Sequence, residues 1–321
     1  MRDAWRRPGG VQRMNPAFSV IVFTTLSGAG LGLWCWLGLR IAFGGPPGLY
    51  EGIGWAIGLL VAAILVAAGL ASSFLHLGKP TRAWRAFSQW RTSWLSREGV
   101  LAVACFLAMG AVFLAGRSGM PPLALRLAAA LLALLALATV YSTAMIYASL
   151  RPIPAWSHRL VVPAYLGFAL LQGALLLPTF TGSAWARGGL WWACVALAAA
   201  LLAVKWRYWR DLDRGLAMPS RGAALGLPQR QARVFERPHT EANFVTREMA
   251  FVVARRHARL LRGVAVALFA LLPLALLVIA GIHAASAPWA WPLAAASALL
   301  GAVVERWLFF AEARHVVTLY Y

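Results

Sequence analysis

The chain has 321 residues, of which 61% are hydrophobic and 12% are charged, and its formal net charge is +20. A soluble domain carries roughly a quarter charged residues, so this composition excludes an ordinary water-soluble fold and indicates a protein that resides in lipid. The basic residues lie between long apolar runs and leave no compact polar domain, which argues against a nucleic-acid-binding protein.

The first apolar run begins near residue 17. It is too long for the hydrophobic region of a signal peptide and lacks a convincing cleavage site, so we expect no cleavable signal. Met14, which opens the segment MNPAFSV, is an alternative to Met1 as the start of the chain.

Eight apolar runs are long enough to cross a membrane. A helix that crosses about 30 Å of hydrocarbon needs roughly 20 apolar residues, and lipid satisfies no exposed backbone groups, so these runs form helices and not strands. The sequence therefore predicts an all-α, polytopic membrane protein with one integral-membrane domain over residues 1–321 and a long cytoplasmic loop at 207–259. The predicted spans cover residues 17–39, 53–76, 98–116, 123–149, 159–180, 188–206, 260–284 and 288–310.

The basic residues divide unequally between the two membrane faces. If each Lys and Arg is assigned to the nearer face, 26 of the 30 fall on the face that holds both termini. The other four are Arg40, Arg117, Arg126 and Arg187. By the positive-inside rule, both termini and the loop between the second and third spans are cytoplasmic, and we expect the protein in a bacterial inner membrane.

That loop belongs to an unusually polar stretch, SSFLHLGKPTRAWRAFSQWRTSWLSREG, at residues 72–99. Ala83, Phe87, Trp90 and Trp94 recur in it at helical spacing. This pattern, which begins at Pro80, is typical of a short amphipathic helix in the membrane interface. We expect this helix to cover a cleft between the second and third spans.

Ionisable groups near the hydrocarbon are the positions most informative about function, because each is costly to place there. His76 ends the second predicted span and Glu98 opens the third, on the same membrane face. An imidazole and a carboxyl group between two such helices suit the proton exchange of a quinol, a two-electron, two-proton carrier. In the alternative interpretation, His76 caps a helix and Glu98 pairs with Arg97.

Glu305 and Arg306, in the last span, are weaker candidates for the same chemistry, because an ion pair at a span end explains them equally well. Arg82, Trp84, Arg85, Trp94 and Arg97 are the expected neighbours of the quinone site.

Metal cofactors in this chain are not expected. Cys35, Cys105 and Cys194 lie in separate apolar runs with no CxxC spacing, which indicates packing residues and no iron–sulfur cluster or metal site. Haem would require paired axial histidines, but His283 lies near the opposite face from His76. A secondary transporter is a further alternative, although the sequence has no matching halves of the usual kind.

The segments HLGKPTRAWRA and SWLSRE, at the second and third of eight spans, resemble the dimethyl sulfoxide reductase anchor subunit family (DmsC/YnfH type), which is related to the NrfD-like membrane subunits. The likeness extends to ERWLFFAEARHV at the end of the last span. It implies a quinone-reactive anchor without haem, partnered by an iron–sulfur electron-transfer subunit and a molybdopterin catalytic subunit. It also implies that His76 and Glu98 are the functional pair.

One feature departs from the respiratory reductases of that family. Their catalytic module usually faces the periplasm, whereas the charge distribution here places the HLGKP loop in the cytoplasm. In this respect, and in MNPAFSV and the long sixth loop, the chain resembles the SoeC-type anchor of a cytoplasm-facing sulfite dehydrogenase. The residues leave open the direction of electron flow, the quinone type and the substrate of the complex.

Overall fold

A computed structural model describes most of the chain. The described residues are 18–44, 52–74, 80–118, 121–182, 188–216, 222, 225–227, 229–232 and 257–316. Met14, His76 and most of the predicted loop 207–259 lie outside them.

Eight helices of the described part are long and apolar enough to span a membrane, which confirms the predicted fold class. The first six are α1 (Phe18–Gly44), α2 (Gly54–Ser73), α3 (Trp94–Arg117), α4 (Pro122–Ala148), α5 (Val161–Thr181) and α6 (Gly189–Asp213). The last two spans are composite: α10 (Ala258–Val266), η4 (Ala267–Leu271) and α11 (Leu272–Ile282) form one, and η5 (Ala284–Ser286) with α12 (Ala287–Ala311) forms the other. The η4 segment is a π-helical turn just before Pro273, whose missing N–H disturbs regular α-helical bonding.

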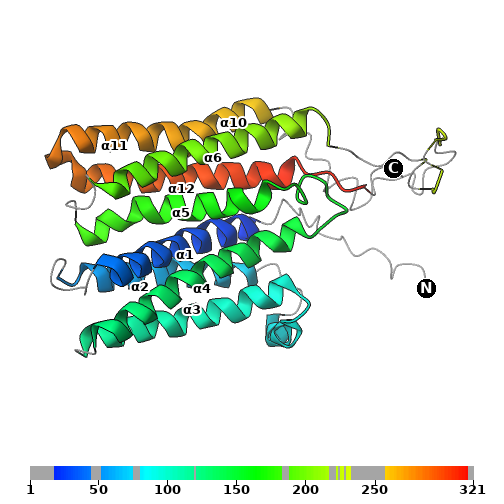
Figure 1. Cartoon of the computed structure of the whole chain (residues 1–321). Helices are drawn as coiled ribbons and strands as arrows, with labels where there is room; N and C mark the ends of the chain where they lie inside the picture. Colours follow the sequence, from blue (N-terminus) through cyan, green and yellow to red (C-terminus); the bar gives the residue numbers. More distant parts are fainter. Residues whose placement is uncertain are drawn as a thin grey trace, which may run out of the picture.

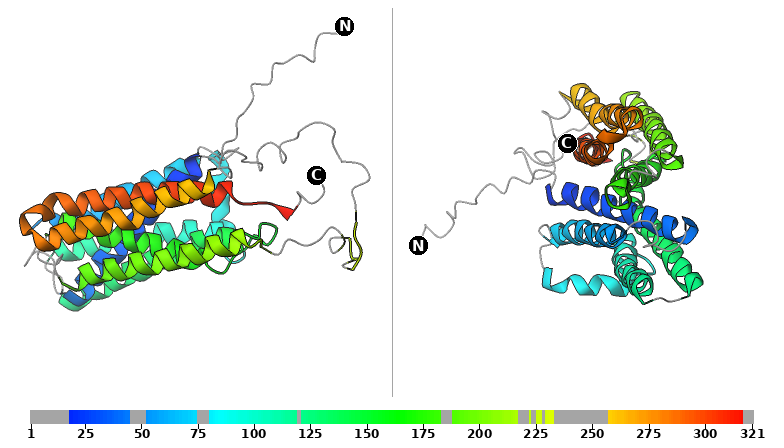
Figure 2. Two further views of the ribbon diagram at one scale, coloured as in Figure 1. Left: turned by 90° about the horizontal axis from the view of Figure 1, so that it is seen from above. Right: turned by 90° about the vertical axis from the view of Figure 1, so that its left-hand side faces the viewer.

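The helices run along a common direction, with α1 in the middle of the bundle (Figure 1). α1 packs against α2 and α4 on one side and against α5 and α12 on the other. The end view shows α2 to α4 below α1, with α5, α6, α11 and α12 above it (Figure 2). The start of α1 and the end of α12 lie at the same end of the bundle, beside the 3-10 helix η2 (Pro80–Gln89), and we call it the η2 end.

The central contact between α1 and α5 depends on two glycines. A Cβ atom built on Gly32 would lie 1.8 Å from the Ala169 carbonyl oxygen, and one built on Gly173 would lie 2.1 Å from the carbonyl carbon of Gly32. No side chain fits between backbones this close, so these glycines set the distance between the two halves of the bundle.

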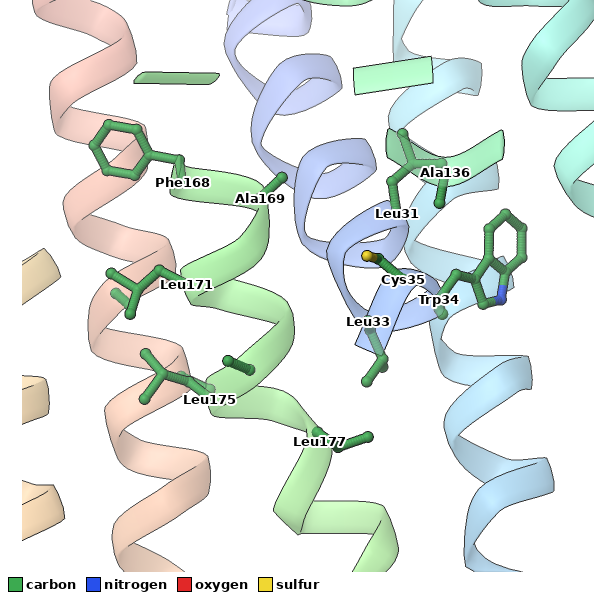
Figure 3. Close-up of a cluster of buried hydrophobic side chains, with 14 of the residues drawn as sticks. Leu31, Leu33, Trp34, Cys35, Ala136, Phe168, Ala169, Leu171, Leu175 and Leu177 are labelled. Atoms are coloured by element: carbon green, nitrogen blue, oxygen red, sulfur yellow. The ribbon is translucent and has the colours of Figure 1, made fainter. Parts of the chain in front are cut away.

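The apolar core lies around this crossing. Figure 3 shows Ala169 pointing from α5 toward α1, Leu171 and Leu175 pointing from α5 toward α12, and Trp34 pointing from α1 toward α2, and all four side chains are buried. Cys35, Cys105 and Cys194 are all buried and not disulfide-bonded, as expected of packing residues.

The expected interfacial helix is present as η2, a 3-10 helix that begins at Pro80 as predicted. It ends at Gln89, before Trp90, and Trp94 begins α3 instead of belonging to η2. In Figure 1 it is the cyan coil seen end-on beside the start of α3, so its axis lies across the bundle direction. It packs against α3, where Phe87 contacts Gly99, and its other large side chains are exposed, as suits a helix in the membrane interface.

Candidate functional site: a buried polar layer at the η2 end

Helix α3 begins a full turn before its predicted start, and this changes the depth of Glu98. Ser93 is the N-cap residue, and its side-chain oxygen accepts a hydrogen bond from the backbone N–H of Ser96. Such a cap satisfies one of the free N–H groups of the first turn. Glu98 therefore lies inside the helix and does not open it, and only 3% of its surface is exposed.

Glu98 faces α4. The Thr143 hydroxyl group donates a hydrogen bond to the Glu98 carboxylate oxygen Oε1. Arg97, the alternative partner considered for Glu98, instead donates hydrogen bonds to the carbonyl oxygens of Trp90 (3.0 Å) and Arg91 (2.6 Å). The alternative Glu98–Arg97 pair is therefore not formed within the described residues, because the Arg97 side chain turns back toward the segment that follows η2 and lies over the Trp94 ring.

The remaining predicted neighbours lie on the surface of η2 or next to it. Arg82, Trp84 and Arg85 are exposed, and the Arg85 guanidinium lies 5.7 Å from the centre of the Trp84 ring. Trp94 is half-buried and packs edge-on against Tyr141 of α4. Among these contacts, only that of Trp94 is with α4, the helix that carries Thr143.

The geometry between α2 and α3 differs from the expectation of two closely packed helices. α2 packs mainly on α1 and α3 mainly on α4, and α2 and α3 touch only slightly. Their contact includes Trp55 at the start of α2 and Phe113 near the end of α3, whose ring centres are 6.1 Å apart. This contact is at the end of the bundle opposite η2, whereas Glu98 lies at the η2 end. His76 lies outside the described residues.

A second pair of predicted residues, Glu305 and Arg306 of α12, is fully buried at the same end of the bundle. Glu305 accepts a 2.5 Å hydrogen bond from the ammonium group of Lys205 on α6, and its other oxygen, Oε2, is 3.9 Å from an Arg306 nitrogen. Both Lys205 and Glu305 are at most 2% exposed. The structure thus confirms an interhelical ion pair, with a partner, Lys205, that the sequence did not single out.

Arg306 extends the layer toward α5. Its guanidinium carbon lies 3.6 Å from the centre of the Tyr165 ring, and Tyr165 in turn stacks on Tyr147 of α4. The stacking of a guanidinium on an aromatic face partly compensates for loss of water around the charge. Glu98, Lys205, Glu305 and Arg306 therefore combine two negative and two positive charges in one layer.

A small cavity lies within this layer, between the Glu98 side and the Arg306 side. It measures about 10 Å³, roughly the room that one water molecule needs, and lies between α1, α4, α5 and α12. Thr143, the partner of Glu98, lines it together with Tyr165, Gln172 and Arg306. Within the described part of the chain, the Tyr165 hydroxyl, the Gln172 Nε2 and the Arg306 Nε atoms are buried and have no hydrogen-bond partner.

On the outer side of the layer, a pocket of about 470 Å³ opens beside the ends of α6 and α12. Arg262 lines it and binds Asp213 and Glu312, each at 2.8 Å. Burial raises the pKa of Glu312 above its ordinary value, and the charge of Arg262 only partly offsets this. Trp209 lies between this pocket and the buried pair, since its ring is 4.8 Å from the Lys205 ammonium group and 5.6 Å from the Arg262 guanidinium.

Four residues of the layer were not predicted from the sequence: Thr143, Tyr165, Gln172 and Lys205. The first three are uncharged residues in apolar runs, and nothing in their spacing distinguishes them from helix-packing residues. Lys205 had a usable signal, because it lies inside the predicted span 188–206, one residue before its end, and a lysine in a span is costly unless it has a partner. No group of three or more His, Cys, Asp or Glu side chains in the described residues is placed to hold a metal ion.

These features define a class: a multi-pass helical membrane protein with ionisable side chains enclosed near one end of its bundle. The comparison with known families makes it specific. The profile of the dimethyl sulfoxide reductase anchor subunit (DmsC) family matches residues 14–311, and the chain belongs to that family. It is the membrane anchor of an oxidoreductase complex.

A relative in Allochromatium vinosum, the C subunit of sulfite dehydrogenase, is 35% identical over 335 aligned positions. The alignment covers 96% of this chain and 99% of the relative. This likeness agrees with the resemblance to SoeC-type anchors that the sequence indicated.

Proposed function

We propose that this anchor exchanges electrons between the membrane quinone pool and an iron–sulfur partner subunit, and that Glu98 and His76 form its quinone site. The observation that carries the proposal is the position of Glu98. It is a carboxyl group enclosed one turn inside the membrane end of α3, the first span after the HLGKP segment and η2, and Thr143 donates a hydrogen bond to it. A carboxyl group at this position can serve as the general acid or base that a quinol or quinone needs as it releases or takes up protons.

In this proposal the chain supplies proton chemistry and position, and the metal centres belong to partners. A quinol that is oxidised gives up two electrons and two protons, and a quinone that is reduced takes up the same. His76 would hydrogen-bond one quinone oxygen, and Glu98 would exchange protons while Thr143 holds its Oε1 atom. Arg82 and Arg85 are exposed on η2, where they are available to an acidic face of a partner.

The family and the relative support the choice of complex. Membership in the DmsC family favours a molybdopterin catalytic subunit as a further partner, and the likeness to a sulfite dehydrogenase subunit favours sulfite as the substrate of that subunit. Sulfite oxidation would deliver electrons to the quinone. An S-oxide or N-oxide reductase would draw electrons from the quinol through the same anchor. The positive-inside rule favours an inner-membrane location with the η2 end in the cytoplasm.

The test compares two activities of the purified complex. We expect His76→Gln and Glu98→Gln to lower quinone-linked turnover by about 100-fold or more, the size of a general acid–base contribution, while dye-linked sulfite oxidation stays normal. Asp211→Asn is the matched control, because it removes a carboxyl group at the same end of the bundle that is 26% exposed. Normal quinone-linked rates in both site variants would disprove the assignment. Optical spectra of the same preparation test the expected absence of haem from this chain.

A further inference from the structure

The cavity beside Thr143 suggests how a proton leaves an enclosed carboxyl group. Three of the residues that line it carry a buried donor without a partner among the described residues: the Tyr165 hydroxyl, Gln172 Nε2 and Arg306 Nε. Leaving one buried polar group unsatisfied costs about 1–3 kcal/mol, so three around one cavity call for a common partner. The cavity has room for about one water molecule.

The other walls of the cavity provide acceptors for such a water molecule. Thr24 and Thr25 of α1 line it, and their hydroxyl groups already donate to backbone carbonyl oxygens of α1, at 3.0 Å and 2.8 Å. Their oxygen lone pairs therefore remain available to accept. A water molecule here can accept from two of the three donors and donate to the threonine oxygens, which gives it the usual three or four hydrogen bonds of a buried water.

Thr143 connects this cavity to Glu98. Its hydroxyl group is within hydrogen-bond reach of the Glu98 carboxylate and, at 3.0 Å, of the Thr139 carbonyl oxygen, and the same side chain lines the cavity. A hydroxyl group has a single proton and rotates, so it can accept a proton from one neighbour as it gives its own to another. Thr143 is thus placed between the carboxyl group and the water position.

On the far side of the cavity, Arg306 leads to a second carboxylate. Its guanidinium stays charged and holds its neighbours in place without taking part in proton exchange. Glu305 Oε2 lies 3.9 Å from an Arg306 nitrogen, is buried, and has no hydrogen-bond partner within the described part of the chain. Glu305 also binds Lys205, whose ammonium group lies 4.8 Å from the centre of the Trp209 ring, and the same ring is 5.6 Å from Arg262, which lines the 470 Å³ pocket at the end of the bundle.

We propose that the cavity holds a water molecule that passes protons between Glu98 and the Lys205–Glu305 pair. One proton moves from the Glu98 carboxyl to the Thr143 oxygen, and the hydroxyl proton of Thr143 moves to the water, where Thr143 takes the place of one of the two other donors. The water then releases one of the protons that it donates to the threonine oxygens, and this proton moves to Glu305 Oε2, while Tyr165 holds the water. No electrons move in these steps, and reversing them supplies a proton to Glu98. The proposal rests on the proposed function, since it assumes that Glu98 exchanges protons with a quinone.

The experiment uses the complete complex with two site variants and one control. Thr143→Val removes the hydroxyl group at nearly constant shape, and Tyr165→Phe keeps the stacked ring. Ser142→Ala is the control, because it removes a buried hydroxyl group of α4 that donates only to its own helix, at the Ala138 carbonyl oxygen. Thr143→Ser retains a hydroxyl group and should retain the activity.

We expect Thr143→Val, which removes a proton-transfer partner, and Tyr165→Phe, which removes a donor that holds the water, to lower quinone-linked turnover by about tenfold or more. Dye-linked turnover and the Kd of a fluorescent hydroxyquinoline N-oxide, a quinol-site probe, should stay unchanged. The solvent deuterium isotope effect on turnover should increase, and added formate, a small weak acid, should restore part of the rate. A structural defect would not respond to formate.

Two results would overturn this inference. The first is a normal rate and isotope effect in both site variants. The second is a loss of rate that weakens probe binding or dye-linked turnover in parallel. Glu98→Gln separates the two proposals: if it leaves quinone-linked turnover normal, the quinone site itself is wrong. If Glu98→Gln abolishes turnover while Thr143→Val and Tyr165→Phe do not, only the water path fails.

Discussion

Replacing Glu305 by glutamine should destabilise this membrane domain more than replacing Lys205 by methionine. Glu305 is shared by two cations, with Lys205 at 2.5 Å and Arg306 at 3.9 Å. With an effective dielectric constant near 20, these distances correspond to attractions of about 7 and about 4 kcal/mol. Lys205→Met loses only the first and leaves Glu305 beside Arg306. Glu305→Gln loses both and leaves two buried cations in one layer.

The expected loss of unfolding free energy is smaller than these attractions, because removing a buried charge also removes its desolvation penalty. Breaking a buried ion pair on one side typically costs about 3–5 kcal/mol. We therefore expect about 3 kcal/mol for Lys205→Met and about 5 kcal/mol for Glu305→Gln. The double variant keeps only Arg306, which lies over the Tyr165 ring, and should be less destabilised than the sum by about 2 kcal/mol.

Thermal unfolding in detergent, followed by the fluorescence of the 16 tryptophans, measures this ranking. At this chain length a change of 1 kcal/mol shifts Tm by about 2 °C, so the two single variants should differ by about 4 °C. Equal Tm values for the single variants, or additive effects in the double variant, would refute the idea that Glu305 is shared between two cations.

Two further predictions concern packing and pH. Gly173→Ala should destabilise the domain by about 1–3 kcal/mol, because its methyl group would meet the α1 backbone at Gly32. The control Gly110→Ala should be neutral or stabilising, because nothing lies within 4 Å of its Cβ. Equal Tm values for the two variants would contradict this prediction. Burial lowers the pKa of His158 below its ordinary value of 6.5 despite Asp211 at 3.3 Å. The unfolded chain then binds the proton more readily, so stability should fall as the pH drops through about 6.5, and Tm of His158→Gln should depend less on pH in that range. An unchanged pH dependence would exclude His158 as the group responsible.

The spans themselves were predictable from sequence, but some of their ends were not. Hydropathy placed the start of the third span at Glu98, because the turn before it carries Ser96 and Arg97. The structure begins the helix at Trp94, since Ser93 caps it. Likewise α6 continues to Asp213 through charged residues that lie beyond the hydrocarbon and were assigned to the loop. A hydropathy window detects the apolar residues that lie in lipid, whereas a helix ends where its backbone hydrogen bonds end.

The candidate site was only half predictable, for a similar reason. Ionisable residues in apolar runs are rare, so Glu98, Glu305 and Arg306 were conspicuous in the sequence. Their partners follow from tertiary structure: Thr143 lies 45 positions from Glu98, and Lys205 lies 100 positions from Glu305. Spacing on one helix predicts which residues share a face, but which helix covers that face is set by packing. For this reason the sequence did not predict that α2 and α3 touch only slightly and that α3 turns Glu98 toward α4.

Helix packing alone does not explain the composition of the buried layer. A hydrophobic side chain in place of each charge would be about as stable or more stable, because a buried ion pair roughly balances its own desolvation. The Glu305–Lys205 pair can be explained as a contact that holds α12 against α6. Packing does not explain Tyr165, Gln172 and Arg306 in the same way, because each has a buried donor without a partner among the described residues, which costs stability in a dry interior. The proposed water molecule would lower this cost, because it accepts from two of the three donors, and it would connect the layer to Glu98 through Thr143, so the arrangement fits proton exchange better than it fits anchoring alone.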